Sequence, residues 1–202
     1  MRIDQLIKNK PITIDENATI QEVLNVMLNQ NLKRLLVLSK DGALIGVIER
    51  KDIAITMIKG LRSNIYAKDI AHRNITTIDV STDIGLVSKL MADENLPFAV
   101  IVDGEKVESI VTRTDIFKIL VELLGARHFG IRLSIQMEDK PGNLAELASI
   151  LSKEGANIVS VGTIGGQGDS VIVTMKIQNI ESDSLETLLV SKGIKILSIK
   201  EV

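Results

Sequence analysis

Few side chains of this sequence could carry out covalent chemistry. The chain contains no cysteine, which removes disulfides, cysteine nucleophiles and thiolate metal sites together. Its two histidines, His72 and His128, lie far apart in the sequence, so no histidine pair stands at the spacing that a metal site needs. No G-x-S-x-G motif is present either. We therefore expect no metal and no catalytic set, and a small hydrolase or transferase remains only a remote alternative.

Composition and charge narrow the possible partners. The 202 residues are 45% hydrophobic and 25% charged, as in an ordinary globular protein of one large or two small domains. The 24 basic and 26 acidic residues give a net charge of −2, without the basic excess that nucleic-acid binding requires. The first residues, MRIDQLIKNK, contain no apolar export segment, and no stretch approaches the roughly 18 apolar residues of a membrane span. We expect a cytoplasmic protein that binds neither nucleic acid nor membrane.

The elements that would position a binding site come as an internal repeat. A shift of about 64 residues aligns Thr13-Ile14-Asp15 with Thr77-Ile78-Asp79 and, after a one-residue slip, Asp52-Ile53 with Asp115-Ile116. Each copy predicts a short extended piece, an amphipathic helix, two strands joined by an Asp-Gly turn, and a second helix. Such a unit has one apolar sheet face that it cannot bury alone. Two copies can cover each other and leave clefts at their junction.

Both copies resemble a known motif over their whole length. The segments ITIDENATIQEVLNVMLNQNLKRLLVLSKDGALIGVIERKDI and ITTIDVSTDIGLVSKLMADENLPFAVIVDGEKVESIVTRTDI are similar to the CBS motif, a tandem module named after cystathionine β-synthase. The resemblance implies a pseudo-twofold pair of β-α-β-β-α repeats over residues 1–62 and 63–125. It also implies a sensor of adenosine derivatives, because many such pairs bind AMP, ATP or S-adenosylmethionine in clefts between the repeats.

The signature of this family is a Thr or Ser followed three residues later by Asp, where the third strand meets the last helix. The second repeat has it as Thr112-Arg113-Thr114-Asp115. The resemblance implies that Asp115 and Thr112 bind ribose hydroxyls, while Arg113 supplies a cation and the helix N-terminus beside them favours phosphate. In the alternative interpretation, Asp115 only caps its helix and Thr112 only suits a strand.

The adenine of such a ligand would lie mostly between aliphatic side chains and backbone groups, since the chain has only one Tyr and three Phe residues. We expect it near Thr77 and Ile78 and the start of the strand at Ala99. Phe98 is the one ring expected to stack on the base. Phe98 could equally belong to the plain core.

The first repeat departs from the signature. Glu49 stands where the Thr belongs, and Asp52 is retained. Two carboxylates could still accept hydrogen bonds from ribose hydroxyls, but near a phosphate they need cations, such as Arg34, Arg50 or Lys51. We therefore expect the cleft of Asp52, Arg34 and Arg50 to be the weaker of two nucleotide sites. Solvated surface charge is an equally good account of these basic residues.

Residues 126–202 predict a different module. An alternating strand over residues 131–137 begins a β-α-β-β-α-β order that ends with a strand over residues 195–199. The segments EDKPGNLAEL and GANIVSV are similar to the ACT domain, a small ferredoxin-like regulatory module. Amino-acid effectors of that family usually sit at a dimer interface, which implies Asp139, Asn143 and Asn157 as contacts. The alternative is that these residues only suit a tight turn, a helix start and a strand entrance.

Two CBS motifs followed by one ACT domain resemble the acetoin-utilisation accessory protein family of bacteria, a name that specifies no chemistry. The leading hypothesis is a non-enzymatic sensor with an α/β (α+β) fold. It would bind AMP, ADP, ATP or S-adenosylmethionine, require no cofactor and act on an unidentified target protein. The alternative is an amino-acid sensor in the ACT domain, with the CBS pair as scaffold. Both modules resemble ones that pair about a two-fold axis, so we expect a homodimer or a dimer of dimers.

Overall fold

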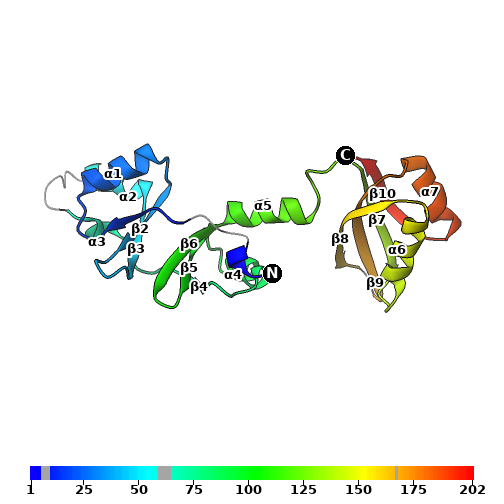
Figure 1. Ribbon diagram of the computed structural model, residues 1–202, viewed down its shortest axis with the longest axis horizontal. Helices are drawn as coiled ribbons and strands as arrows, with labels where there is room; N and C mark the ends of the chain where they lie inside the picture. Colours follow the sequence, from blue (N-terminus) through cyan, green and yellow to red (C-terminus); the bar gives the residue numbers. More distant parts are fainter. Residues whose placement is uncertain (6–9, 59–64, 167) are drawn as a thin grey trace. The chain divides into compact units, whose positions relative to one another are not determined.

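The computed structural model describes residues 1–5, 10–58, 65–166 and 168–202. They form two compact units, Met1–Ile116 and Phe117–Val202. The first unit contains both repeats, and the second contains the C-terminal third (Figure 1). The expected boundary between the repeats, at residues 62 and 63, lies outside the described residues. The division between the units falls inside helix α5 (Arg113–Leu123), earlier than the boundary expected after residue 125.

The two repeats have the same order of elements. The first comprises β1 (Thr13–Asp15), α1 (Ile20–Asn29), β2 (Arg34–Leu38), β3 (Leu44–Glu49) and α2 (Arg50–Ile58). The second comprises β4 (Thr77–Asp79), α4 (Ile84–Asp93), β5 (Phe98–Asp103), β6 (Lys106–Thr112) and α5. In each repeat the first strand pairs parallel with the second, and the second pairs antiparallel with the third. The predicted β-α-β-β-α order is confirmed. Two short helices that no sequence pattern predicted accompany it, η1 (Ile3–Gln5) and α3 (Ala67–Ile70).

Local sequence explains where the first helix of each repeat begins and ends. Thr19 caps α1 through a capping box with Glu22, and the side chain of Asp83 caps α4. After both helices an asparagine adopts the left-handed conformation, Asn31 at φ 48° and Asn95 at φ 53°. These residues turn the chain out of the helix and lead it into β2 or β5.

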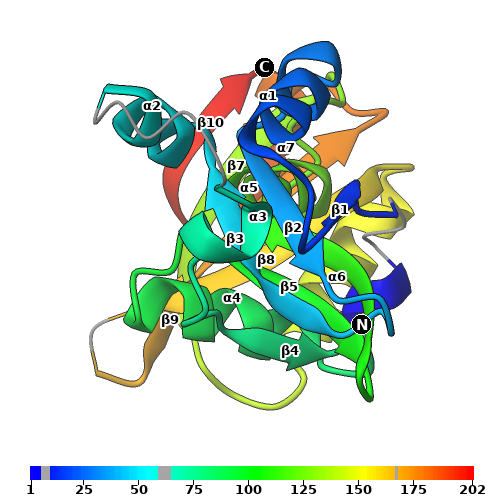
Figure 2. The same ribbon diagram turned by 90° about the vertical axis from the view of Figure 1, so that its left-hand side faces the viewer.

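A shared apolar cluster joins the two repeats. Each repeat has its own core between its sheet and its helices. In addition, Leu36 of β2, Val47 of β3 and Val100 of β5 are buried together, with Phe98 and Ile110 packed against them. Strands β2 and β3 therefore lie against β5 and β6. In Figure 2, β2 and β3 lie in front of β5. Each repeat covers an apolar sheet face of the other, as the internal repeat predicts.

The second unit is a four-stranded sheet with two helices on one face (Figure 1). Its elements are β7 (Ile131–Glu138), α6 (Asn143–Lys153), β8 (Asn157–Gly165), β9 (Ser170–Gln178), α7 (Ser182–Ser191) and β10 (Lys195–Glu201). The strands are antiparallel in the order β10-β7-β9-β8, which confirms the predicted β-α-β-β-α-β arrangement. None of the helices in the described part of the chain is long and apolar enough to cross a bilayer.

Hydrogen bonds tie the end of α5 to this sheet. The carbonyl oxygen of Leu124 accepts from Arg132 Nη2 at 2.7 Å and from Ser160 Oγ at 2.9 Å. Carbonyl groups at a helix C-terminus lack partners within the helix and carry partial negative charge, so a guanidinium group is favourable there. These bonds explain why the part of α5 from Phe117 onward belongs to the second unit.

Candidate ligand-binding clefts

Two clefts lie between the repeats of the first unit. The Thr112 cleft, named after the residue at the end of β6, has a volume of about 250 Å³. Its walls include Ile12, Leu32, Arg34, Ile110, Thr112 and Asp115. The Glu49 cleft, named after the residue at the end of β3, has a volume of about 420 Å³. Its walls include Val47, Glu49, His72, Thr76, Leu96 and Phe98.

The internal repeat relates the two clefts. Ile12 and Thr76 stand at matching positions before the first strand of each repeat, and they line opposite clefts. Leu32 and Leu96 stand at matching positions before the second strand of each repeat, and they also line opposite clefts. Each cleft therefore combines the segments that lead into the first two strands of one repeat with the third strand of the other. This crossing follows from the packing of β2 and β3 against β5 and β6.

Asp115 and Thr112 make the reciprocal hydrogen bonds of a capping box at the start of α5. Asp115 Oδ2 accepts from the Thr112 N–H at 2.9 Å and from Thr112 Oγ1 at 2.6 Å. The N–H of Asp115 donates to Thr112 Oγ1 at 3.4 Å. The capping role of Asp115 is therefore real. Because both side chains also line the Thr112 cleft, the cap holds them where a ligand can reach them.

The first repeat has the matching turn without the hydroxyl. Asp52 Oδ2 accepts from the Glu49 N–H at 2.8 Å, and Asp52 Oδ1 lies 3.0 Å from His72 Nε2. Arg34 Nε donates to Glu49 Oε1 at 2.8 Å, and Lys51 Nζ lies 2.7 Å from Glu49 Oε2. The hydrogen bond from Lys51, helped by that from Arg34, holds the pKa of Glu49 below its usual value although burial opposes this shift. Glu49 is therefore ionised at neutral pH.

Arg113 and Arg50, two of the cations expected beside phosphate, donate hydrogen bonds to oxygens of the protein itself. Arg113 Nε donates to the Leu96 carbonyl at 2.8 Å, and Arg113 Nη2 donates to Asn95 Oδ1 at 2.6 Å. Arg50 Nη2 donates to the Leu32 carbonyl at 2.7 Å. Each guanidinium group satisfies oxygen atoms at the point where a left-handed asparagine ends a helix. The place of both residues beside a phosphate stays a prediction.

The residues expected around the adenine do not lie together in one cleft. Ile78 is only 5% exposed within the core of the second repeat, and Thr77 is exposed next to it on β4. Phe98 and Thr76 line the Glu49 cleft, whereas Asp115 lines the other one. Five apolar residues that line the Thr112 cleft were not expected from the sequence, namely Pro11, Ile12, Leu32, Leu36 and Ile110. The sequence could have identified these residues only if it were known that each cleft takes residues from both repeats.

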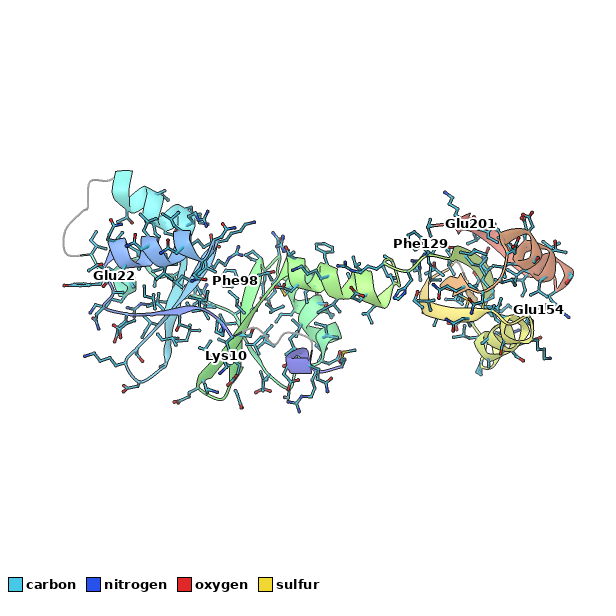
Figure 3. The ribbon with its side chains drawn as sticks, turned by 45° about the horizontal axis from the view of Figure 1, so that its top comes forward. Lys10, Glu22, Phe98, Phe129, Glu154 and Glu201 are labelled. Atoms are coloured by element: carbon cyan, nitrogen blue, oxygen red, sulfur yellow. The ribbon has the colours of Figure 1, made fainter. Side chains whose placement is uncertain are left out.

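Arg34 stands between the two clefts. It lines the Thr112 cleft, but it donates to Glu49, and its guanidinium carbon lies 4.6 Å from the centroid of the Phe98 ring. Both of these partners line the Glu49 cleft. Figure 3 shows Phe98 at the junction of the repeats, together with Lys10, which belongs to the Thr112 cleft. Arg34 was expected near Asp52; the structure places it on the wall of the Thr112 cleft, in contact with Glu49 and Phe98 of the other cleft.

The second unit has a cavity of its own, with a volume of about 470 Å³ between α6, the end of β7 and the start of β10. Asn143 lines this cavity and donates from Nδ2 to the Glu138 carbonyl at 3.0 Å. Among the described residues, Asp139 and Asn157 are not part of the cavity wall. Asn157 is exposed at the start of the edge strand β8. The three residues expected to hold an amino acid are therefore not gathered within one chain.

Comparison with known proteins decides the family. The CBS domain model matches residues 3–59 and 67–122, more than half of the chain. The chain belongs to the CBS domain family. Its C-terminal part matches the TTHA0829-like ACT domain over residues 129–200. This CBS protein therefore has the tandem CBS and ACT organisation that the resemblance predicted.

Solved structures share the fold of the CBS pair. The CBS domain pair of protein MJ0100, in complex with 5′-methylthioadenosine and S-adenosyl-L-methionine, matches with a TM-score of 0.52 and 25% identity, over 59% of this chain and 99% of that one. CBS domain protein PAE2072 from Pyrobaculum aerophilum, complexed with AMP, has a TM-score of 0.52 and 21% identity, over 60% and 98%. The AcuB protein of Vibrio cholerae, assigned to acetoin utilization, has a TM-score of 0.56 and 14% identity, over 63% and 95%.

The curated relatives are longer proteins. Uncharacterized protein MJ1404 of Methanocaldococcus jannaschii is 23% identical over 72% of this chain and 38% of its own length. L-aspartate semialdehyde sulfurtransferase of the same organism is 25% identical over 58% of this chain and 23% of its own length. This CBS protein thus spans well under half of the length of these relatives.

Proposed function

We propose that this CBS protein is a non-enzymatic regulatory sensor that binds an adenosine derivative, such as AMP, ADP, ATP or S-adenosylmethionine, in the Thr112 cleft. One observation carries the proposal: the capping box holds Thr112 and Asp115 at the wall of a cleft between the repeats. A carboxylate fixed in this way can accept hydrogen bonds from the two vicinal hydroxyls of a ribose.

The remaining walls of the Thr112 cleft suit the other parts of such a ligand. Ile12, Leu32 and Ile110 supply apolar surface for a purine. Arg34 supplies a cation for a phosphate or a carboxylate. The complexes of the MJ0100 pair with S-adenosyl-L-methionine and of PAE2072 with AMP support this ligand class.

The Glu49 cleft is the weaker site in this proposal. Asp52, its counterpart of Asp115, already has one oxygen on the Glu49 N–H and the other beside His72. Asp52 is not among the described walls of this cleft, whereas Asp115 is among those of the Thr112 cleft. Phe98 offers this cleft the stacking ring that the Thr112 cleft lacks among its described walls.

Helix α5 is the element through which a ligand bound in the Thr112 cleft would affect the rest of the protein. Its first turn contains Asp115, and just beyond its last residue the Leu124 carbonyl is held by Arg132 and Ser160. A ligand changes the state of a protein only by its difference in affinity between two states. We propose that this difference arises at the first turn of α5 and reaches an unidentified target protein in the cytoplasm.

A second candidate is an amino-acid sensor in the ACT domain. It is favoured by the cavity beside Asn143, whose walls carry both carboxylates and ammonium groups, including Glu146 and Lys195. A zwitterion needs both signs of charge. In this case the CBS pair acts as scaffold.

A thermal-shift screen distinguishes the two candidates. AMP, ADP, ATP, S-adenosylmethionine, NADH and the twenty amino acids are added separately to the full chain. A ligand at 100 times its Kd should add about 2.7 kcal/mol to the free energy of unfolding. Stabilisation by an adenosyl compound supports the sensor in the CBS pair, whereas stabilisation by amino acids alone overturns it in favour of the ACT domain.

A further inference from the structure

Arg34 and Phe98 occupy the same position in the two repeats, at the start of β2 and of β5. Each pairs with the last residue of its neighbouring strand, Arg34 with Glu49 and Phe98 with Thr112. The first repeat thus carries an ion pair where the second carries an aromatic ring and a hydroxyl. The two clefts share one framework but differ in charge.

The ion pair crosses from one cleft to the other. Arg34 lines the Thr112 cleft, and Glu49 lines the Glu49 cleft. Their side chains are 23% and 19% exposed, so the 2.8 Å contact is partly shielded from water. A partly buried pair is screened less by solvent than an exposed one, and its charges respond more to each other.

We propose that Arg34 is the ligand-selecting residue of the Thr112 cleft, and that Glu49 competes for it from the neighbouring cleft. This inference rests on the function proposed above. A ligand with an anionic group, such as AMP, gains Arg34 as a partner and draws it from Glu49. Neutral adenosine has no anionic group that binds Arg34, so the cleft favours anionic ligands over neutral ones. Because Glu49 competes with the ligand for Arg34, it determines how large this preference is.

The surroundings of Glu49 allow this exchange. When Arg34 moves to a ligand, Glu49 keeps Lys51, which lies 2.7 Å from its other oxygen. The carboxylate is therefore not left unpaired, which would be costly in a partly buried position. Lys10 also lines the Thr112 cleft and adds to its positive charge, while Asp115 of the same cleft is held in the capping box.

The same competition links the two clefts. Any compound in the Glu49 cleft that binds the Glu49 carboxylate releases Arg34 for an anion in the Thr112 cleft. By reciprocity, an anion bound in the Thr112 cleft makes Glu49 more available to that compound. The two sites are then coupled through one side chain without a change of fold.

Calorimetric titration with AMP and with adenosine tests the proposal on the full chain. Glu49→Gln should bind AMP about tenfold more tightly, because Arg34 loses its competitor, and should bind adenosine within about twofold of the unaltered protein. Arg34→Gln should lose about tenfold in AMP affinity and keep its adenosine affinity. The double variant should match Arg34→Gln alone, since the competition no longer exists.

Two exposed sites provide matched controls for the change in net charge. Lys33→Gln, next to Arg34, and Glu105→Gln, in the turn between β5 and β6, should leave the ratio of AMP to adenosine affinity unchanged. Thermal unfolding of each variant verifies that it is folded. If Arg34→Gln and Glu49→Gln bind both compounds with the unaltered ratio, the Arg34 proposal is overturned and the proposed function stands. If neither compound binds the unaltered chain, the Arg34 proposal is also overturned, and the wider ligand screen decides the proposed function.

Discussion

Asp115 Oδ2 receives two hydrogen bonds from Thr112, one from its backbone N–H at 2.9 Å and one from its hydroxyl at 2.6 Å. The carboxylate thus closes the first turn of α5 and also borders the Thr112 cleft. Folding stability and the proposed ligand affinity therefore call on the same side chain but on different properties of it. Stability needs an acceptor atom, and the proposed ribose contact needs the charge.

Substitutions of Asp115 should separate these two properties. Asp115→Ala removes the acceptor of the capping box, and we expect it to lose about 1 kcal/mol of unfolding free energy. Asp115→Asn keeps an oxygen that can accept from the Thr112 N–H, so it should lose clearly less. Urea denaturation followed by circular dichroism measures both, with Thr114→Ala in the same turn as control. Equal losses in the two Asp115 variants would contradict the capping account.

Asp52→Ala should weaken adenosyl binding less than Asp115→Ala does. The physical reason is that Asp115 lines the Thr112 cleft, whereas Asp52 is not among the described walls of the Glu49 cleft. Calorimetry of both variants with the same ligand makes the comparison. If Asp52→Ala abolishes binding while Asp115→Ala leaves it intact, the ligand occupies the Glu49 cleft and the assignment is reversed.

The ion pairs of Glu49 predict a pH-dependent part of the stability. The hydrogen bond from Lys51, and then that from Arg34, lower the pKa of Glu49 below 4.5 in the folded protein. Between the folded pKa and the unfolded value the unfolded chain binds more protons. The stabilisation is therefore present above the unfolded pKa and is lost as the pH falls through the folded pKa. As the pH is lowered, the unfolding temperature of Glu49→Gln should fall less steeply than that of the unaltered protein or of the control Glu105→Gln. The same steepness in all three proteins would contradict the prediction.

The full chain should assemble into a homodimer or a dimer of dimers. Helix α5, which the structure describes in full, buries none of its residues, although it carries Phe117, Leu120 and Leu123. The edge strand β8 contains no charged residue and no proline. Apolar helix faces and uncharged edge strands are usually covered by a partner. Light scattering at micromolar concentration should give at least twice the chain mass of 22.1 kDa, and a species of 22.1 kDa would refute the prediction.

The elements of the fold could be predicted because their signals are local. Alternation of Ile131, Leu133 and Ile135 predicts β7, and all three side chains are buried in the core of the second unit. The spacing of Thr112 and Asp115 predicts a helix start, and the capping box is present there. The internal repeat further predicts that two copies cover each other, which the cluster between the repeats confirms.

The composition of each cleft could not be predicted, because it depends on how the repeats pack. Phe98 and Asp115 belong to one repeat but line different clefts. Arg113 stands two residues before Asp115 in the sequence, yet its guanidinium group donates a hydrogen bond to Asn95, the residue in left-handed conformation that follows α4. Neither arrangement has a signal in the spacing of residues within one repeat.

Calorimetric titration of the full chain with AMP and with S-adenosylmethionine tests the central claim most directly. The comparison includes the unaltered protein, Asp115→Asn and the control Thr114→Ala. We predict a Kd in the micromolar range for the unaltered and control proteins, or about −8 kcal/mol. Asp115→Asn should weaken the binding by about 1.5–3 kcal/mol, because it loses charge-assisted bonds to the ribose. Equal affinities in all three proteins, or no binding of either compound, would contradict the account.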